Sequence, residues 1–187
     1  MTLAVEERPR TLAEIRATLD VPDGVRVEIL EEQIVMSPSP RAGHAMTLTL
    51  VQEQLGPACP ADLMVVQNLE IVCPAAGAVL IPDLVVVARA VLLKDRPQNG
   101  ADVVDLACEV TSPSTRRQDL TAKRAAYAIQ NVPLYLVVDR RSATLELFSD
   151  PADGTYRGRH TVPFGRLLPV PEPFVFTLDS RDFPASH

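Results

Sequence analysis

The sequence predicts an α/β domain in which helices flank a central mixed β-sheet and β-hairpins lie at its edges. Apolar runs at 83–88, 103–110 and 134–138 indicate buried strands, and Leu84–Val87 is apolar on both faces. Helical patterns lie between strands, and alternating segments near both ends of the chain indicate hairpins. A purely parallel sheet would lack those hairpins, so a mixed sheet is expected.

The first half of the chain contains one clear helix-start signal. Thr11 and Glu14 have the spacing of a capping box, which predicts a short helix at 11–19. The next elements are expected to be strands at 25–30 and 34–36, a helix at about 41–55 and one long strand at 63–72. Glu31-Glu32 makes a poor turn between the first two strands, because tight hairpins favour Asn-Gly or Asp-Gly.

The second half repeats the helix-start signal. Thr115 and Gln118 have capping-box spacing, which predicts a helix running to about residue 131. Further strands are expected at 144–148, 156–162 and 174–178. We expect these elements to form a single domain at 11–180, with a flexible N-terminal tail at 1–10 and a C-terminal tail at 181–187.

Composition excludes several classes of protein. A chain of 187 residues with 47% hydrophobic residues can bury a sizeable core. Its net charge of −6 argues against strong nonspecific binding to nucleic acid, although a local basic patch remains compatible with it. Three single cysteines form neither a zinc motif nor a disulfide framework. With no signal peptide and no apolar run of about 20 residues, we expect a cytoplasmic protein without a membrane span.

The stretch CEVTSPSTRRQDLTAKRAAY at 108–127 carries the strongest chemical signal. Glu109 ends a buried strand, and Lys123 lies on the helix that follows. Asp83 opens another apolar strand, so two carboxylates and one amine can converge. Mg²⁺ prefers one or two carboxylates with water and phosphate oxygens, and a nearby ammonium can stabilise developing negative charge. Asp119 lies one turn before Lys123 and could orient it.

Each of these residues also has a structural interpretation. Asp83 could be an ordinary acid at a strand start, and Lys123 could lie on a solvated helix face. Asp119 and Lys123 could form a surface ion pair worth a few tenths of a kcal/mol. A buried Glu109 is costly unless it is paired, which favours function.

Five further residues are weaker candidates. Glu28 could add a carboxylate or lie exposed on its strand. His44, near a helix start, could reach the metal site or a phosphate, or could be a capping or surface residue. Arg116 and Arg117 lie in a first helical turn, where basic residues oppose the helix dipole, so phosphate contact and a solvated face are both open. Tyr127 is expected to pack in the core rather than act in catalysis.

Four stretches resemble the Uma-two family, which is grouped with the PD-(D/E)-x-K restriction-endonuclease-like superfamily. They are VRVEILEEQIVMSPSPRAGH (25–44), IPDLVVV (81–87), CEVTSPSTRRQDLTAKRAAY (108–127) and NVPLYLVVD (131–139), and the third is the most specific. The resemblance spans roughly residues 11–178. It implies a restriction-endonuclease-like fold, a Mg²⁺ (or Mn²⁺) cofactor and cleavage of DNA.

By this resemblance, Asp83 and Glu109 are the two metal-binding acids, and Glu28 and His44 match positions near the site. The superfamily pattern places a lysine two residues after the second acid, where this chain has Thr111. The resemblance implies that Lys123, on the following helix, takes the place of that lysine, as in the family.

Three functional hypotheses follow from the sequence. The first is a metal-dependent DNA endonuclease acting as a homodimer, since two-strand cutting suits two-fold symmetry. The second is a catalytically weak or inactive module for binding or regulation, which the acidic net charge and the displaced lysine favour. The third is a nuclease for RNA or a small nucleotide.

Overall fold

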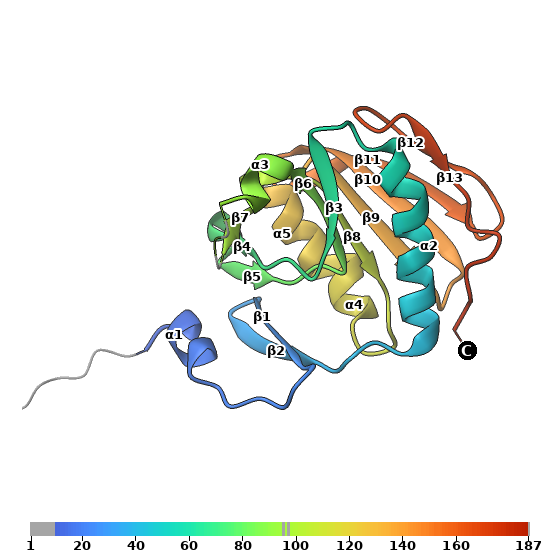
Figure 1. Cartoon of the computed structure of the whole chain (residues 1–187). Helices are drawn as coiled ribbons and strands as arrows, with labels where there is room; N and C mark the ends of the chain where they lie inside the picture. Colours follow the sequence, from blue (N-terminus) through green and yellow to red (C-terminus); the bar gives the residue numbers. More distant parts are fainter. Residues whose placement is uncertain (1–9, 95, 97, 187) are drawn as a thin grey trace, which may run out of the picture.

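A six-stranded mixed sheet runs through the centre of the molecule, with a layer packed on each face (Figure 1). The computed structural model describes residues 10–94, 96 and 98–186. The sheet order is β11-β10-β9-β8-β6-β3, in which β8 and β9 are parallel and the other neighbours antiparallel. The strands are β3 (Leu63–Gln67), β6 (Leu84–Ala88), β8 (Val104–Val110), β9 (Leu134–Asp139), β10 (Thr144–Ala152) and β11 (Thr155–Pro163). The predicted fold class is confirmed.

A second, five-stranded sheet has the order β2-β1-β5-β4-β7. Its strands are β1 (Arg26–Leu30), β2 (Gln33–Ser37), β4 (Ile71–Cys73), β5 (Ala78–Leu80) and β7 (Asn99–Gly100). The prediction of one long strand at 63–72 is wrong, because β3 and β4 belong to different sheets. The chain bends between them at Asn68, whose φ of 53° is a left-handed conformation that asparagine tolerates better than most residues.

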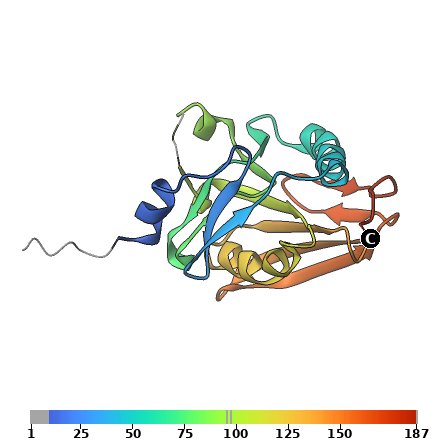
Figure 2. The ribbon, with the colours of Figure 1, turned by 90° about the horizontal axis from the view of Figure 1, so that it is seen from below.

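The central strands are buried on both faces, as their sequence predicts. Leu84 and Val86 belong to a core formed with helix α2 (Ala42–Ala58) and the hairpin of β12 (Leu168–Val170) and β13 (Phe176–Leu178). Val85 and Val87 belong to a second core, formed with the five-stranded sheet and helix α5 (Arg124–Ile129). Figure 2 shows α2 and α5 on opposite sides of the central sheet.

The helix predicted to begin at Thr115 does have Thr115 as its N-cap residue, but the predicted capping box is absent. The Thr115 side chain accepts a hydrogen bond from the Ser112 amide at 3.1 Å and does not cap the helix. The helix comprises α4 (Arg116–Gln118), a π-helical segment η3 (Asp119–Lys123) and α5. Segments of π-helix occur frequently at functional positions, and this one carries two of the predicted site residues.

The two ends of the described chain pack against the domain. Helix α1 (Leu12–Ala17) has the predicted capping box between Thr11 and Glu14. Near the other end, Phe183 is buried and the Arg140 side chain donates to the Pro184 carbonyl at 3.0 Å. Residues 1–9 of the predicted N-terminal tail lie outside the described residues.

Three short helical elements, η1 (Pro74–Ala76), α3 (Arg89–Leu92) and η2 (Ala101–Val103), complete the fold. Within the described residues, no helix combines the length and apolar character needed to cross a membrane.

The hairpin turn between β1 and β2 supplies a stability prediction. Glu31 and Glu32 have φ values of 50° and 56°, a left-handed conformation that costs an ordinary residue about 1–2 kcal/mol. We expect Glu32→Gly to raise the free energy of unfolding by about 0.5–1 kcal/mol, after the larger entropy of the unfolded glycine is subtracted. Urea denaturation measures the change. Glu32→Ala removes the same carboxylate but keeps Cβ, so an equal gain there would contradict the explanation.

Candidate active site

The pairing of β6 with β8 brings the two predicted acids to neighbouring strands. Leu84 lies opposite Cys108, so the next step of the antiparallel register places Asp83 opposite Glu109. The Val110 amide also donates to Asp83 Oδ2 at 2.8 Å. Asp83 therefore lies where β6 begins and β8 ends, with both carboxylates buried.

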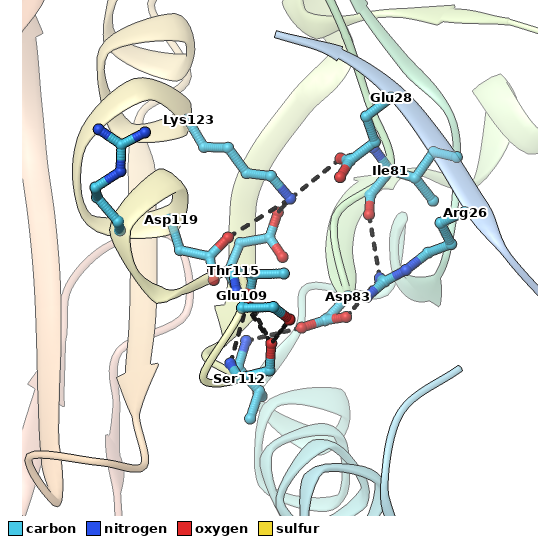
Figure 3. Close-up of polar contacts among 12 residues, drawn as sticks. Arg26, Glu28, Ile81, Asp83, Glu109, Ser112, Thr115, Asp119 and Lys123 are labelled. Carbon is cyan, nitrogen blue, oxygen red and sulfur yellow. Dashed lines mark hydrogen bonds and ion pairs between the residues drawn. The ribbon is translucent and has the colours of Figure 1, made fainter. Parts of the chain in front are cut away.

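Lys123 extends from η3 into a group of carboxylates (Figure 3). Its Nζ lies 2.9 Å from Glu109 Oε1, 3.1 Å from Glu28 Oε1 and 3.6 Å from Asp119 Oδ1. Only 3% of the Lys123 surface is exposed. The solvated-face interpretation of Lys123 and the surface-pair interpretation of Asp119 are therefore both wrong.

Glu28 reaches this group from β1 of the smaller sheet. Its Oε1 also accepts a hydrogen bond from the Ile81 amide at 2.7 Å, two residues before Asp83. Glu28 is 2% exposed, so the interpretation of an exposed strand position is wrong. Through these bonds Glu28 joins the smaller sheet to the segment that precedes β6.

Asp83 binds two basic side chains. Arg26 Nη1 donates to its Oδ1 at 2.6 Å, and His44 Nε2 lies 3.0 Å from its Oδ2. Burial alone would raise the pKa of Asp83, but the hydrogen bond and charge of His44, followed by the charge of Arg26, lower it to about 2. His44 itself is buried rather than a surface residue.

Arg26 is the site residue that sequence reasoning missed. It lies two residues before Glu28 on the same strand, so both side chains project from one face of β1. That spacing was the available signal, because a basic residue shared a face with a candidate acid.

Burial and mutual repulsion favour protonation of two of the carboxylates. Burial, together with repulsion from Asp119, Asp83 and Glu28, raises the pKa of Glu109 well above its ordinary value, against the attraction of Lys123. Burial, together with repulsion from Asp83 and Glu28, raises the pKa of Asp119 to about 6, against the attraction of Lys123. Burial lowers the pKa of Lys123, but the surrounding carboxylates outweigh this and raise it. Lys123 is therefore a permanent cation at neutral pH.

Three candidates lie apart from the carboxylate group. Arg116 binds Asp139 at the end of β9, with Nη2 2.7 Å from Oδ2, and Arg117 is exposed. Tyr127 is fully buried, with its ring centroid 5.0 Å from that of Tyr135, as expected for a core residue.

A solved structure shares the overall fold of this chain. A crystal structure described as "a putative nuclease belonging to DUF820", from Anabaena variabilis, matches with a TM-score of 0.74 and 16% sequence identity. The match covers 94% of this chain and 97% of that chain, and it establishes the fold.

Residues 12–181 match the Uma2 family, described as "Putative restriction endonuclease". The chain belongs to this family, which confirms the resemblance found in the sequence. No curated protein matches the sequence significantly.

Proposed function

We propose that this protein is a metal-dependent endonuclease that hydrolyses phosphodiester bonds in DNA. The observation that carries the proposal is the meeting of Asp83 and Glu109 at the ends of paired strands, with Lys123 bonded to the second acid. Membership of a family described as "Putative restriction endonuclease" supports the same reaction class.

The buried charges fit a divalent cation. When all four buried carboxyl groups of this site are ionised, the described residues supply two permanent cations to balance them, Arg26 and Lys123, so a bound divalent cation would favour the ionised form of the acids. No group of three or more His, Cys, Asp or Glu in the described part of the chain is arranged to hold a metal by itself. Mg²⁺ nevertheless needs only one or two carboxylates, with water and phosphate oxygens completing its shell. Asp83 and Glu109 would hold it.

The protein side chains then have separate roles. A bound divalent cation supplies polarisation of the phosphate and a more acidic attacking water. Lys123 remains protonated, so it acts through its charge, which stabilises the negative charge that develops on the phosphate, and not as a base. Asp119 and Glu28 hold the Lys123 ammonium beside Glu109, and Arg26 and His44 hold Asp83 in place.

Incubation with supercoiled plasmid and Mg²⁺ or Mn²⁺ tests the proposal. We expect nicked and linear products that disappear with EDTA, and a loss of about 10²–10³-fold in rate for Asp83→Asn and Glu109→Gln. Glu53→Gln, which removes an exposed carboxylate from α2, is the control and keeps full activity. Absence of cleavage together with absence of metal binding by calorimetry would instead support the binding or regulatory module.

We also propose a homodimer as the form that cuts both strands, since a two-fold arrangement presents one site to each strand. Sedimentation of the protein at the concentration used for cleavage measures its oligomeric state. A monomer that linearises plasmid in one binding event would contradict this part of the proposal.

A further inference from the structure

A pocket of about 270 Å³ opens beside the proposed metal site. Two Ser-Pro-Ser turns form its walls, one at 37–40 between β2 and α2 and the other at 112–115 between β8 and α4. Arg26 and His44, which bind the two oxygens of Asp83, also line this pocket, so two side chains connect it to the acid.

The lining of this pocket suits an anion. No carboxylate lines it, although the whole chain carries a net charge of −6. Its polar side chains are either basic or hydroxyl-bearing, namely Arg26, Arg41, His44, Ser37, Ser39, Ser112, Ser114 and Thr115. Guanidinium groups and hydroxyls are the donors that proteins use to bind phosphate oxygens.

Two polar groups at the pocket lack protein partners. Arg41 is exposed and forms no ion pair within the residues that the structure describes. The ring of His44 is buried, and its Nδ1 has no hydrogen-bond partner among the described residues. Arg41 also precedes the 17-residue helix α2, whose first turn has no acidic residue and no side-chain cap. No residue in the first turn of α2 therefore neutralises the positive end of the helix dipole.

We propose that this pocket binds a phosphate of the DNA backbone that neighbours the one being cut, with Arg41 as its principal contact. The inference rests on the proposed nuclease function and adds a second phosphate position to it. It explains how a chain of negative net charge could still hold a polyanion: Arg26 and Arg41 line one opening near the acids, and no carboxylate is among its described lining residues.

Fluorescence anisotropy of a labelled DNA duplex in EDTA, measured across a range of KCl concentrations, tests this pocket without cleavage. We expect Arg41→Gln to weaken binding severalfold and to reduce the slope of log affinity against log salt by about 1. Arg166→Gln removes the same charge from an exposed position outside the pocket, and we expect it to change the affinity less than twofold.

The results separate this inference from the nuclease proposal. Binding that depends on Arg41 in a protein that never cleaves DNA would support the pocket and reject the enzyme. Equal affinities and salt slopes for Arg41→Gln and Arg166→Gln would overturn the pocket even if cleavage occurs. Absence of duplex binding, with inorganic phosphate alone bound in a parallel calorimetric titration, would also overturn it.

Discussion

Replacing Lys123 with methionine is expected to lower the free energy of unfolding at pH 7 by about 3–5 kcal/mol. Methionine keeps much of the side-chain volume but removes the ammonium that lies within 3.6 Å of Glu28, Glu109 and Asp119. Breaking a buried ion pair from one side is costly, because the remaining charge stays in a medium that solvates it poorly. Urea denaturation followed by circular dichroism measures the loss.

The chain supplies a matched control for this variant. Lys94, the other lysine in the sequence, is exposed, so Lys94→Met should change stability by less than about 0.5 kcal/mol. Adding Glu109→Gln to Lys123→Met removes one of the acidic groups that have lost their cation. The double variant should therefore regain part of the lost free energy of unfolding. Equal stability of the two single lysine variants would show that the ammonium does not hold the carboxylates together.

In EDTA, the protein is expected to lose stability as the pH rises from about 4 to above 6, by on the order of 2–3 kcal/mol for Asp119 alone. The folded state raises the pKa of Asp119 from 3.8 to about 6, so it retains a proton that the unfolded chain releases. The stabilisation is complete below pH 3.8 and is lost above about pH 6. The raised pKa of Glu109 acts in the same direction.

Asp83 behaves in the opposite way. Its pKa falls to about 2 in the folded state, so its contribution is complete above pH 3.8 and disappears only as the pH falls toward 2. The two effects therefore occupy different pH ranges. Urea titrations between pH 4 and 7 should give a shallower pH dependence for Asp119→Asn than for the wild type. The exposed Asp102→Asn is the control, and an unchanged slope for Asp119→Asn would reject the assignment to Asp119.

Much of the fold was predictable from burial patterns, and the errors in the prediction have local causes. Strands buried on both faces, such as Leu84–Ala88 and Leu134–Asp139, have apolar sequences that leave little alternative. The break between β3 and β4 was missed because apolar residues continue on both sides of Asn68. The π-helical segment at Asp119–Lys123 was not predicted, because the sequence pattern there is that of an ordinary α-helix.

The site was predictable where charge conflicts with burial. Glu109 is an acid inside an apolar strand, and that conflict points to a partner. Arg26 was missed because strand alternation gives the face of a side chain but not its partner, which here precedes a strand of the other sheet. Phosphate contact and a solvated face were the two interpretations of Arg116, yet its side chain binds Asp139, which follows 23 residues later at the end of β9. Contacts at such separations depend on the order of strands, which the sequence does not state.

An anomalous-difference map from crystals grown with Mn²⁺ tests most directly whether Asp83 and Glu109 share a cation. We predict a peak in contact with carboxylate oxygens of both residues, and its loss in Glu109→Gln crystals grown in the same solution. A well-ordered site without such a peak, or Mn²⁺ bound only to other residues, would contradict the account.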